Sequence, residues 1–113
     1  GNFMNKDLET IIDREIHRYL MDHDVKTCGK GFYYLVSAIK KGLDNFTNIY
    51  NIMKLYEEIA EEYNKNTSNI ERSIRYLIKT TGATNKEFIS TAVYRIACKI
   101  FTPDKEHDIS KAS

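Results

Sequence analysis

Apolar residues recur at the spacing of α-helices in successive stretches of the chain, separated by short polar breaks. Within each stretch they lie three or four residues apart, so they share one face of a helix. The main stripes are Leu8, Ile12, Ile16, Tyr19 and Leu20; Phe32, Leu35, Val36 and Ile39; Ile70, Ile74, Leu77 and Ile78; and Phe88, Ile89, Ala92, Val93, Ile96 and Ile100. The pattern predicts an all-α fold, a compact bundle of about five or six helices.

The breaks carry residues that start and stop helices. Residues 25–31 contain two glycines and predict a loop into the second helix, which we expect to end at residues 42–45. Thr84 and Glu87 have the spacing of a capping box, in which each residue bonds the backbone amide of the other. This spacing predicts a last helix over about residues 85–101.

The segment from Tyr56 to Lys79 predicts two helices joined by a sharp polar turn, a helix-turn-helix. Asn64 tolerates the left-handed backbone conformation that such a turn needs. The second helix is expected over about residues 68–79. We expect Ser68 to cap it, with Glu71 reaching back to the cap.

Burial of the apolar stripe of this second helix leaves a polar face exposed. The face carries Asn69, Arg72, Ser73 and Tyr76, with Glu71 and Arg75 on its flanks. Arginine can pair with guanine through two hydrogen bonds, asparagine with adenine, and a carboxylate can accept from cytosine. This chemistry suits base readout in a major groove, but it also suits a solvated helix with an ion pair between Glu71 and Arg75.

Charge is segregated around this segment. Residues 57–62 carry four glutamates and no base, whereas residues 63–80 carry two lysines and two arginines against one glutamate. The net charge of the chain is only +1. Because a phosphate backbone attracts a local basic surface, that total does not exclude nucleic acid. Lys26 and Lys30 could also reach phosphates beside the start of the second predicted helix, or they could be a plain basic loop.

Other chemistries find little support. No nucleophile has a neighbouring histidine at a recognisable spacing, so we expect no enzyme activity. His17, His23 and Cys28 do not complete a metal-ligand set, and the sequence predicts no metal and no cofactor. Cys28 and Cys98 are expected to be reduced thiols. The 113 residues contain no apolar run for a membrane span and no signal peptide, which predicts a cytoplasmic protein without a membrane partner.

The domain prediction has three parts. Residues 1–4 would be a tag remnant and the natural start, residues 5–101 a helical domain, and residues 102–113 a polar, flexible tail. A stand-alone protein and a piece of a longer regulator would give similar ends. On the last helix Tyr94, Cys98 and Phe101 form a second apolar stripe, which the first helix could cover or a second copy of the chain could meet.

Three blocks of the sequence resemble one known family. The run IMKLYEEIAEEYNKNTSNIERSIRYLI, with GKGFYYLVSAI before it and TNKEFISTAVYRI after it, is similar to the C-terminal DNA-binding domain of stage zero sporulation protein A. That protein is the response regulator that starts spore formation. The resemblance covers roughly residues 11–100 and implies a transcription regulator that binds double-stranded DNA.

The resemblance also implies roles for individual residues. Glu71, Arg72 and Arg75 match polar positions of the family's recognition helix, whereas Asn69 replaces an arginine, which puts the preferred base at one step in doubt. The family's longer segment before its last helix, implicated in contacting RNA polymerase sigma factor, is reduced here to residues 80–84. The sigma factor contact is therefore less secure than DNA binding. A homodimer on tandem sites is a further partner left open.

The leading hypothesis is a sequence-specific double-stranded DNA binder that regulates transcription. Its base-reading residues would be Asn69, Glu71 and Arg72, and its phosphate contacts would be Lys30, Lys65, Ser68, Arg75, Tyr76 and Lys79. The alternative is a protein-interaction module, a partner or antagonist of a full-length regulator or of a sigma factor, that uses the Tyr94 stripe and binds little DNA. The shortened segment and the absence of a receiver domain motivate this alternative.

Overall fold

The computed structural model describes residues 2–101, with side chains from Lys6 onward, and every regular element in that range is helical. The elements are α1 (Asn2–Asp22), α2 (Lys30–Asp44), the 3₁₀ helix η1 (Phe46–Tyr50), α3 (Ile52–Tyr63), α4 (Thr67–Leu77), the 3₁₀ turn η2 (Lys79–Thr81) and α5 (Asn85–Phe101). The five α-helices confirm the all-α prediction. Residue 1 of the proposed start (residues 1–4) and the proposed tail (residues 102–113) lie outside the described residues, whereas residues 2–4 belong to α1.

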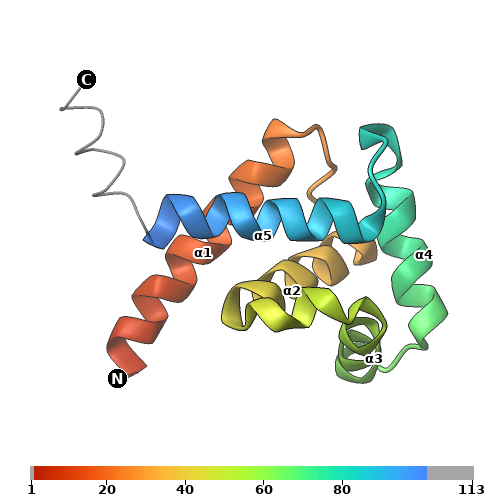
Figure 1. Cartoon of the computed structure of the whole chain (residues 1–113), viewed down its shortest axis with the longest axis horizontal. Helices are drawn as coiled ribbons and strands as arrows, with labels where there is room; N and C mark the ends of the chain where they lie inside the picture. The colour runs from red at the N-terminus through yellow and green to blue at the C-terminus, as the bar shows by residue number, and fades with distance from the viewer. Residues whose placement is uncertain (1, 102–113) are drawn as a thin grey trace.

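Helix α2 lies at the centre of the bundle, with α5 across one side of it and α4 at one end (Figure 1). All five α-helices contribute fully buried apolar side chains to a single core. The largest fully buried side chains are Ile16, Leu20, Leu35, Ile39, Leu55, Ile59, Ile70, Ile74, Ile89 and Val93 of these helices and Ile78 just after α4. Gly42 is buried inside α2, and a β-carbon there would lie 2.6 Å from Val93 Cγ2. Its lack of a side chain therefore lets α5 approach α2.

Ion pairs join neighbouring helices at the rim of the core. They are Asp13–Lys40 between α1 and α2 at 2.6 Å, Lys41–Glu62 between α2 and α3 at 3.1 Å, and Glu15–Lys99 between α1 and α5 at 3.1 Å. Pairs with exposed partners stabilise a fold by only about 0–1 kcal/mol each. Apolar burial therefore dominates the stability. No helix in the described part of the chain is long and apolar enough to cross a bilayer.

In α2 the predicted apolar stripe agrees with the observed burial only in part. Leu35 and Ile39 are buried as expected, but Phe32 and Val36 are only half-buried. Tyr34, which the stripe did not include, is 3% exposed. It lies edge to face against Tyr63 of α3, with ring centroids 5.1 Å apart, so an aromatic contact between helices extends the buried face of α2.

The start of α5 confirms the predicted capping box. The backbone amide of Thr84 donates to Glu87 Oε1 at 2.9 Å, and the amide of Glu87 donates to the Thr84 hydroxyl at 3.1 Å. The hydrogen bond from the Thr84 backbone amide is the main cause that holds the pKa of the Glu87 carboxyl below its ordinary value, and the Thr84 hydroxyl lowers this pKa further.

This cap predicts a pH-dependent contribution to stability. The folded-state pKa of Glu87 is depressed, so the contribution is complete above the unfolded-state pKa of about 4.3 and is lost as the pH falls through the lower folded-state value. In urea unfolding, Glu87→Gln should be less stable than the parent at pH 6, and the difference should shrink by pH 3. Glu61→Gln, an exposed change on α3, serves as the control. A difference that stays constant with pH would contradict the capping role.

Candidate nucleic-acid interface

The turn between α3 and α4 is built by three consecutive polar residues. Asn64 adopts the left-handed conformation, with φ 55° and ψ 48°, as the sequence predicted. The backbone amide of Lys65 then donates to the carbonyl oxygen of Ala60 at 2.8 Å, which closes the end of α3. Asn66 follows directly as the N-cap of α4, so the chain reverses within residues 64–66.

The predicted cap of α4 at Ser68 is wrong. Asn66 Oδ1 accepts from the backbone amide of Asn69 at 2.8 Å, and the Ser68 hydroxyl also donates to it. The helix begins at Thr67 and ends at Leu77, so Lys79 lies in η2 and not in the helix. Residues 66–69 all have side chains that can cap, and the pattern alone did not distinguish among them.

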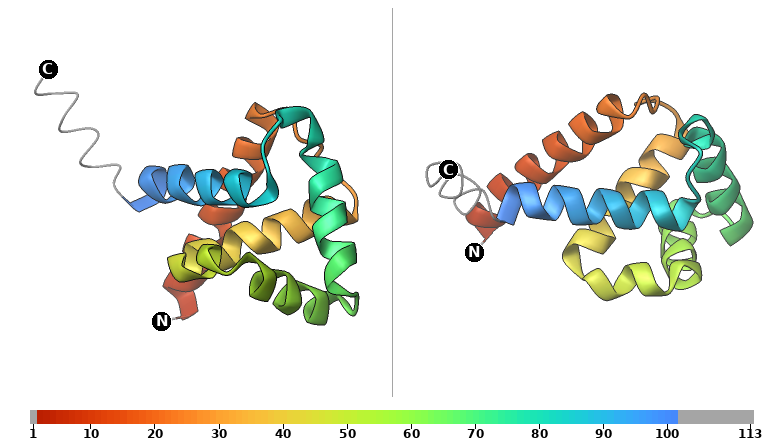
Figure 2. Two further views of the ribbon diagram at one scale, coloured as in Figure 1. Left: turned by 45° about the vertical axis from the view of Figure 1, so that its right-hand side comes forward. Right: turned by 45° about the horizontal axis from the view of Figure 1, so that its top comes forward.

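Helix α4 lies at one edge of the molecule, with α2, α3 and α5 on one side and the other side open (Figures 1 and 2). Ile70, Ile74 and Ile78 are at most 1% exposed, as predicted, although Leu77 is only half-buried. The opposite side, which we call the outward face, consists of the exposed side chains of Ser68, Arg72, Arg75 and Tyr76. A helix with one open side can enter a groove of DNA without rearrangement of the fold.

The predicted base-reading residues are paired with their neighbours along α4. Arg72 Nη2 donates to Asn69 Oδ1 at 3.1 Å, and Arg75 Nε donates to Glu71 Oε2 at 3.0 Å. Arg72 is exposed, whereas Asn69 and Glu71 are half-buried at the flanks. Arg72 is therefore the base-reading candidate with the most freedom to reach outward.

The C-terminal end of α4 borders a basic recess of about 530 Å³. It is lined by Asp24, Lys26, Gly31, Ser73, Tyr76, Leu77, Lys79 and Thr80. The ammonium group of Lys79 lies 5.7 Å from the centre of the Tyr76 ring. Lys26 and Lys79 thus line one recess, and two ammonium groups beside one site suit a phosphate.

The other two predicted phosphate lysines are more dispersed. Lys65 is exposed in the turn at the opposite end of α4, and Lys30 begins α2 without lining the recess. Among the described residues, none of Lys26, Lys65, Arg72 and Lys79 forms an ion pair with a carboxylate, whereas Lys40, Lys41 and Lys99 do. Four bases without a carboxylate partner in the described structure therefore lie on α4 or next to it. Only the fold reveals that Lys26 and Lys79 share a site, because they are far apart in sequence.

The predicted stripe on α5 forms one wall of an apolar groove of about 420 Å³. Phe46, Ile49 and Tyr50 of η1 face Ser90, Val93, Tyr94, Ala97, Cys98 and Phe101 across it. Tyr94 is 70% exposed and Phe101 51% exposed, while Cys98 is half-buried. Tyr94 and Cys98 therefore have η1 as their neighbour, whereas Phe101 also lines a recess with Leu8 and Ile12 of α1, one of the covers that the sequence had left open.

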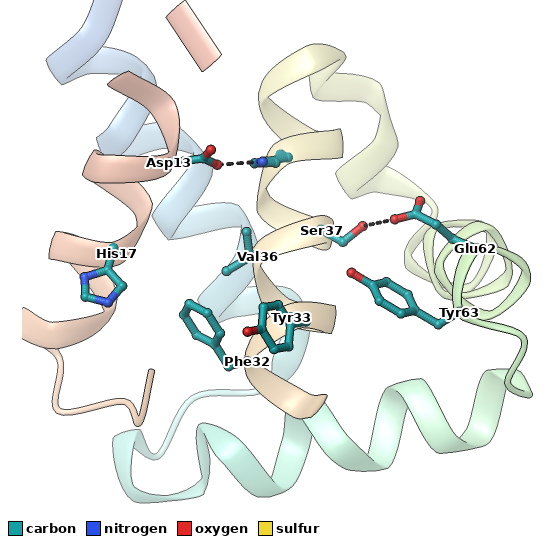
Figure 3. Close-up of a pocket in the computed structure, with 9 residues that line it drawn as sticks. Asp13, His17, Phe32, Tyr33, Val36, Ser37, Glu62 and Tyr63 are labelled. Carbon is teal, nitrogen blue, oxygen red and sulfur yellow. Dashed lines mark hydrogen bonds and ion pairs between the residues drawn. The ribbon is translucent and has the colours of Figure 1, made fainter. Parts of the chain in front are cut away.

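A third recess, between α1, α2 and α3, holds polar groups that are already paired (Figure 3). Ser37 Oγ donates to Glu62 Oε1 at 3.3 Å, and Asp13 is paired with Lys40. The His17 ring meets Phe32 edge on, at a centroid distance of 6.1 Å, and does not approach the serine. The recess therefore lacks the contact between a nucleophile and its base that covalent catalysis needs.

The histidines and cysteines do not gather into a ligand set within the described residues. His23 stacks on Tyr19 at a centroid distance of 4.1 Å, and its Nδ1 lies 2.8 Å from the Tyr19 carbonyl oxygen. His17 lies on the exposed side of α1, and Cys28 is exposed in the loop before α2. His23 therefore packs at the end of α1, and His17 and Cys28 lie at a solvated surface.

Residues 16–98 match the family described as sporulation initiation factor Spo0A C terminal. The match spans α2, η1, α3, α4 and η2 completely, most of α5 and the last third of α1. No solved structure matches the chain.

Proposed function

The chain belongs to the Spo0A C-terminal family, a family of DNA-binding domains and not of enzymes, and from this we propose that it binds double-stranded DNA sequence-specifically and regulates transcription. The observation that carries the proposal is the partition of α4. Its isoleucines are hidden in the core, whereas its arginines stay exposed at an open edge of the molecule. In this reading α3 and α4 form a helix-turn-helix, and α4 lies in the major groove.

We assign the contacts from exposure and chemistry. Arg72 and Glu71 read base edges and Asn69 adjusts the preference, which requires Glu71 to leave its bond with Arg75. The phosphate contacts are Lys65 and Ser68 at the start of α4, Arg75 and Tyr76 along it, Lys79 beyond its end, and Lys30 with Lys26 from the neighbouring segment. Such a protein would act in the cytoplasm, where it can reach its DNA.

Selection of bound duplexes from a random library tests this function and also identifies the DNA sequence that the protein prefers. The proposal expects one enriched sequence that the protein prefers over a scrambled duplex by about 10³-fold or more at physiological salt. Retention of all sequences alike, or of none, would refute sequence-specific binding. A repeated half-site in the enriched duplexes would indicate a homodimer on tandem sites.

Lys79→Ala should weaken binding to every duplex alike and reduce the slope of log K against log salt by about 1, since it removes one phosphate contact. Fluorescence anisotropy over a salt series measures both effects. Lys6→Ala is the matched control: it removes the same charge from an exposed position near the start of α1, away from α4 (Figure 1). Equal salt slopes for the two variants would exclude Lys79 from the interface.

The apolar groove beside α5 favours a second candidate, a protein-interaction module. Phe46, Tyr50, Tyr94 and Phe101 are each at least half exposed, and grouped apolar surface of this kind is typical of protein contacts. Sedimentation with and without a sigma factor or a full-length regulator, beside a gel shift at moderate salt, separates the candidates. Association through the groove without a gel shift would favour this second function.

A further inference from the structure

One buried amide joins three helices next to the proposed recognition helix. Asn85, the first residue of α5, is 8% exposed. Its Nδ2 donates to the Tyr56 hydroxyl of α3 at 3.0 Å and to the backbone carbonyl oxygen of Glu71 in α4 at 3.1 Å. The two protons of a single amide group thus link α5 to both helices of the predicted helix-turn-helix.

Helix capping does not explain this asparagine. The cap of α5 is supplied by Thr84 and Glu87, which bond each other's backbone amides. The Asn85 side chain points instead to α3 and α4 through the bonds described above. Its position at the start of α5 therefore serves a contact between helices.

Stability is also a poor explanation for an amide at this position. Asn85 Oδ1 is buried and has no hydrogen-bond partner among the described residues. A buried acceptor without a partner lowers stability, and an apolar side chain of similar size would avoid that penalty. What an apolar side chain cannot supply is a donor to the Glu71 carbonyl.

The Glu71 carbonyl lies on one flank of α4, and a second contact holds the other flank. Successive residues are about 100° apart around a helix, so Glu71 and Ser73 lie on opposite sides of the stripe formed by Ile70 and Ile74. A β-carbon at Gly31 would lie 2.9 Å from the Ser73 carbonyl oxygen, which shows how closely α2 abuts this flank. Asn85 on one side and the backbone of α2 on the other therefore restrict rotation of α4 about its axis.

We infer that Asn85, supported by Tyr56, is a positioning residue that sets the rotation of α4 for base readout. The inference rests on the proposed DNA-binding function. Under this inference, the reading of bases depends strongly on Asn85, and the binding of phosphates depends on Asn85 less. A rotated α4 misplaces the guanidinium of Arg72 against a base edge, whereas lysines on long flexible stems still reach phosphates.

Asn85→Ala tests this inference through the ratio of affinities for the selected duplex and a scrambled duplex, measured well below the unfolding temperature. We expect the ratio to fall by about tenfold or more, with a much smaller change for the scrambled duplex. Tyr56→Phe removes only one hydroxyl and should lower the ratio less, which keeps the test valid if the alanine variant folds poorly. Ser37→Ala is the matched control, because Ser37 is also buried and hydrogen-bonded, but its bond goes to Glu62 of α3 and not to α4.

A second measurement needs no DNA. The amide of Arg75 donates to the Glu71 carbonyl within the helix, so its NMR signal and hydrogen exchange report on that carbonyl. Asn85→Ala should shift this signal and speed exchange along α4, and Ser37→Ala should not. An unchanged affinity ratio, or α4 signals that change no more than in the control, would overturn the inference. A parent that prefers no duplex would overturn the proposed function, and the exchange data would still show whether Asn85 holds α4.

Discussion

Replacing Arg72 by alanine is expected to cost about 1–3 kcal/mol of binding to the selected duplex and to relax specificity at one guanine. Arg72 is exposed on α4, and its only recorded partner in the described structure is the Asn69 side chain. Its removal therefore leaves the core intact and takes away only the proposed two-bond contact with a base. Competition with duplexes that carry single base changes measures the loss of affinity and shows at which base pair specificity is relaxed.

Arg72→Lys is the matched control for this prediction. Lysine keeps the positive charge but lacks the planar fork that bonds both acceptors of guanine. Specificity should therefore fall with lysine as well, while affinity for a scrambled duplex should stay near that of the parent. Equal affinity and equal base preference for the parent and both variants would refute the assignment of Arg72.

Ile74→Ala is expected to lower the free energy of unfolding by about 2–5 kcal/mol. Ile74 is 0% exposed and faces the core, so the shortened side chain loses apolar burial and leaves a cavity that the surrounding helices cannot fully close. Urea unfolding followed by circular dichroism at 222 nm, a wavelength typical for helical signal, measures the change for this all-α fold.

Tyr76→Ala provides the comparison on the opposite side of α4. Tyr76 is 73% exposed, so its replacement should change the free energy of unfolding by no more than about 0.5 kcal/mol. The same variant should bind DNA more weakly if the tyrosine holds a phosphate. A large loss of stability in Tyr76→Ala, or a small one in Ile74→Ala, would contradict the partition of α4 into a buried and an outward face.

Most of the fold could be predicted because helical periodicity is a local property that the sequence displays directly. The isoleucines of α4 and the apolar face of α5 repeat every three or four residues, and burial follows from that repeat. Asn64 and the Thr84–Glu87 box were also correct, because each depends on residues that are adjacent or three apart. The exposed position of Arg72 followed from the same periodicity.

Other features depend on which helices meet, and periodicity does not report this. The choice of Asn66 over Ser68 as the cap of α4 depends on where the turn leaves α3. The bond from Asn85 to the Glu71 carbonyl joins residues from two helices, and the contact of Gly31 with Ser73 depends on the approach of α2. Each requires the tertiary arrangement, for which the sequence pattern carries no signal.

Titration of isotope-labelled protein with the selected duplex, followed by NMR, tests the central claim most directly. We expect the largest chemical-shift changes to fall on the outward face of α4 and on Lys26 and Lys79 around the basic recess. The apolar groove beside α5 should change little. Large changes at Tyr94 and Phe101 with an unaffected α4 would contradict the account.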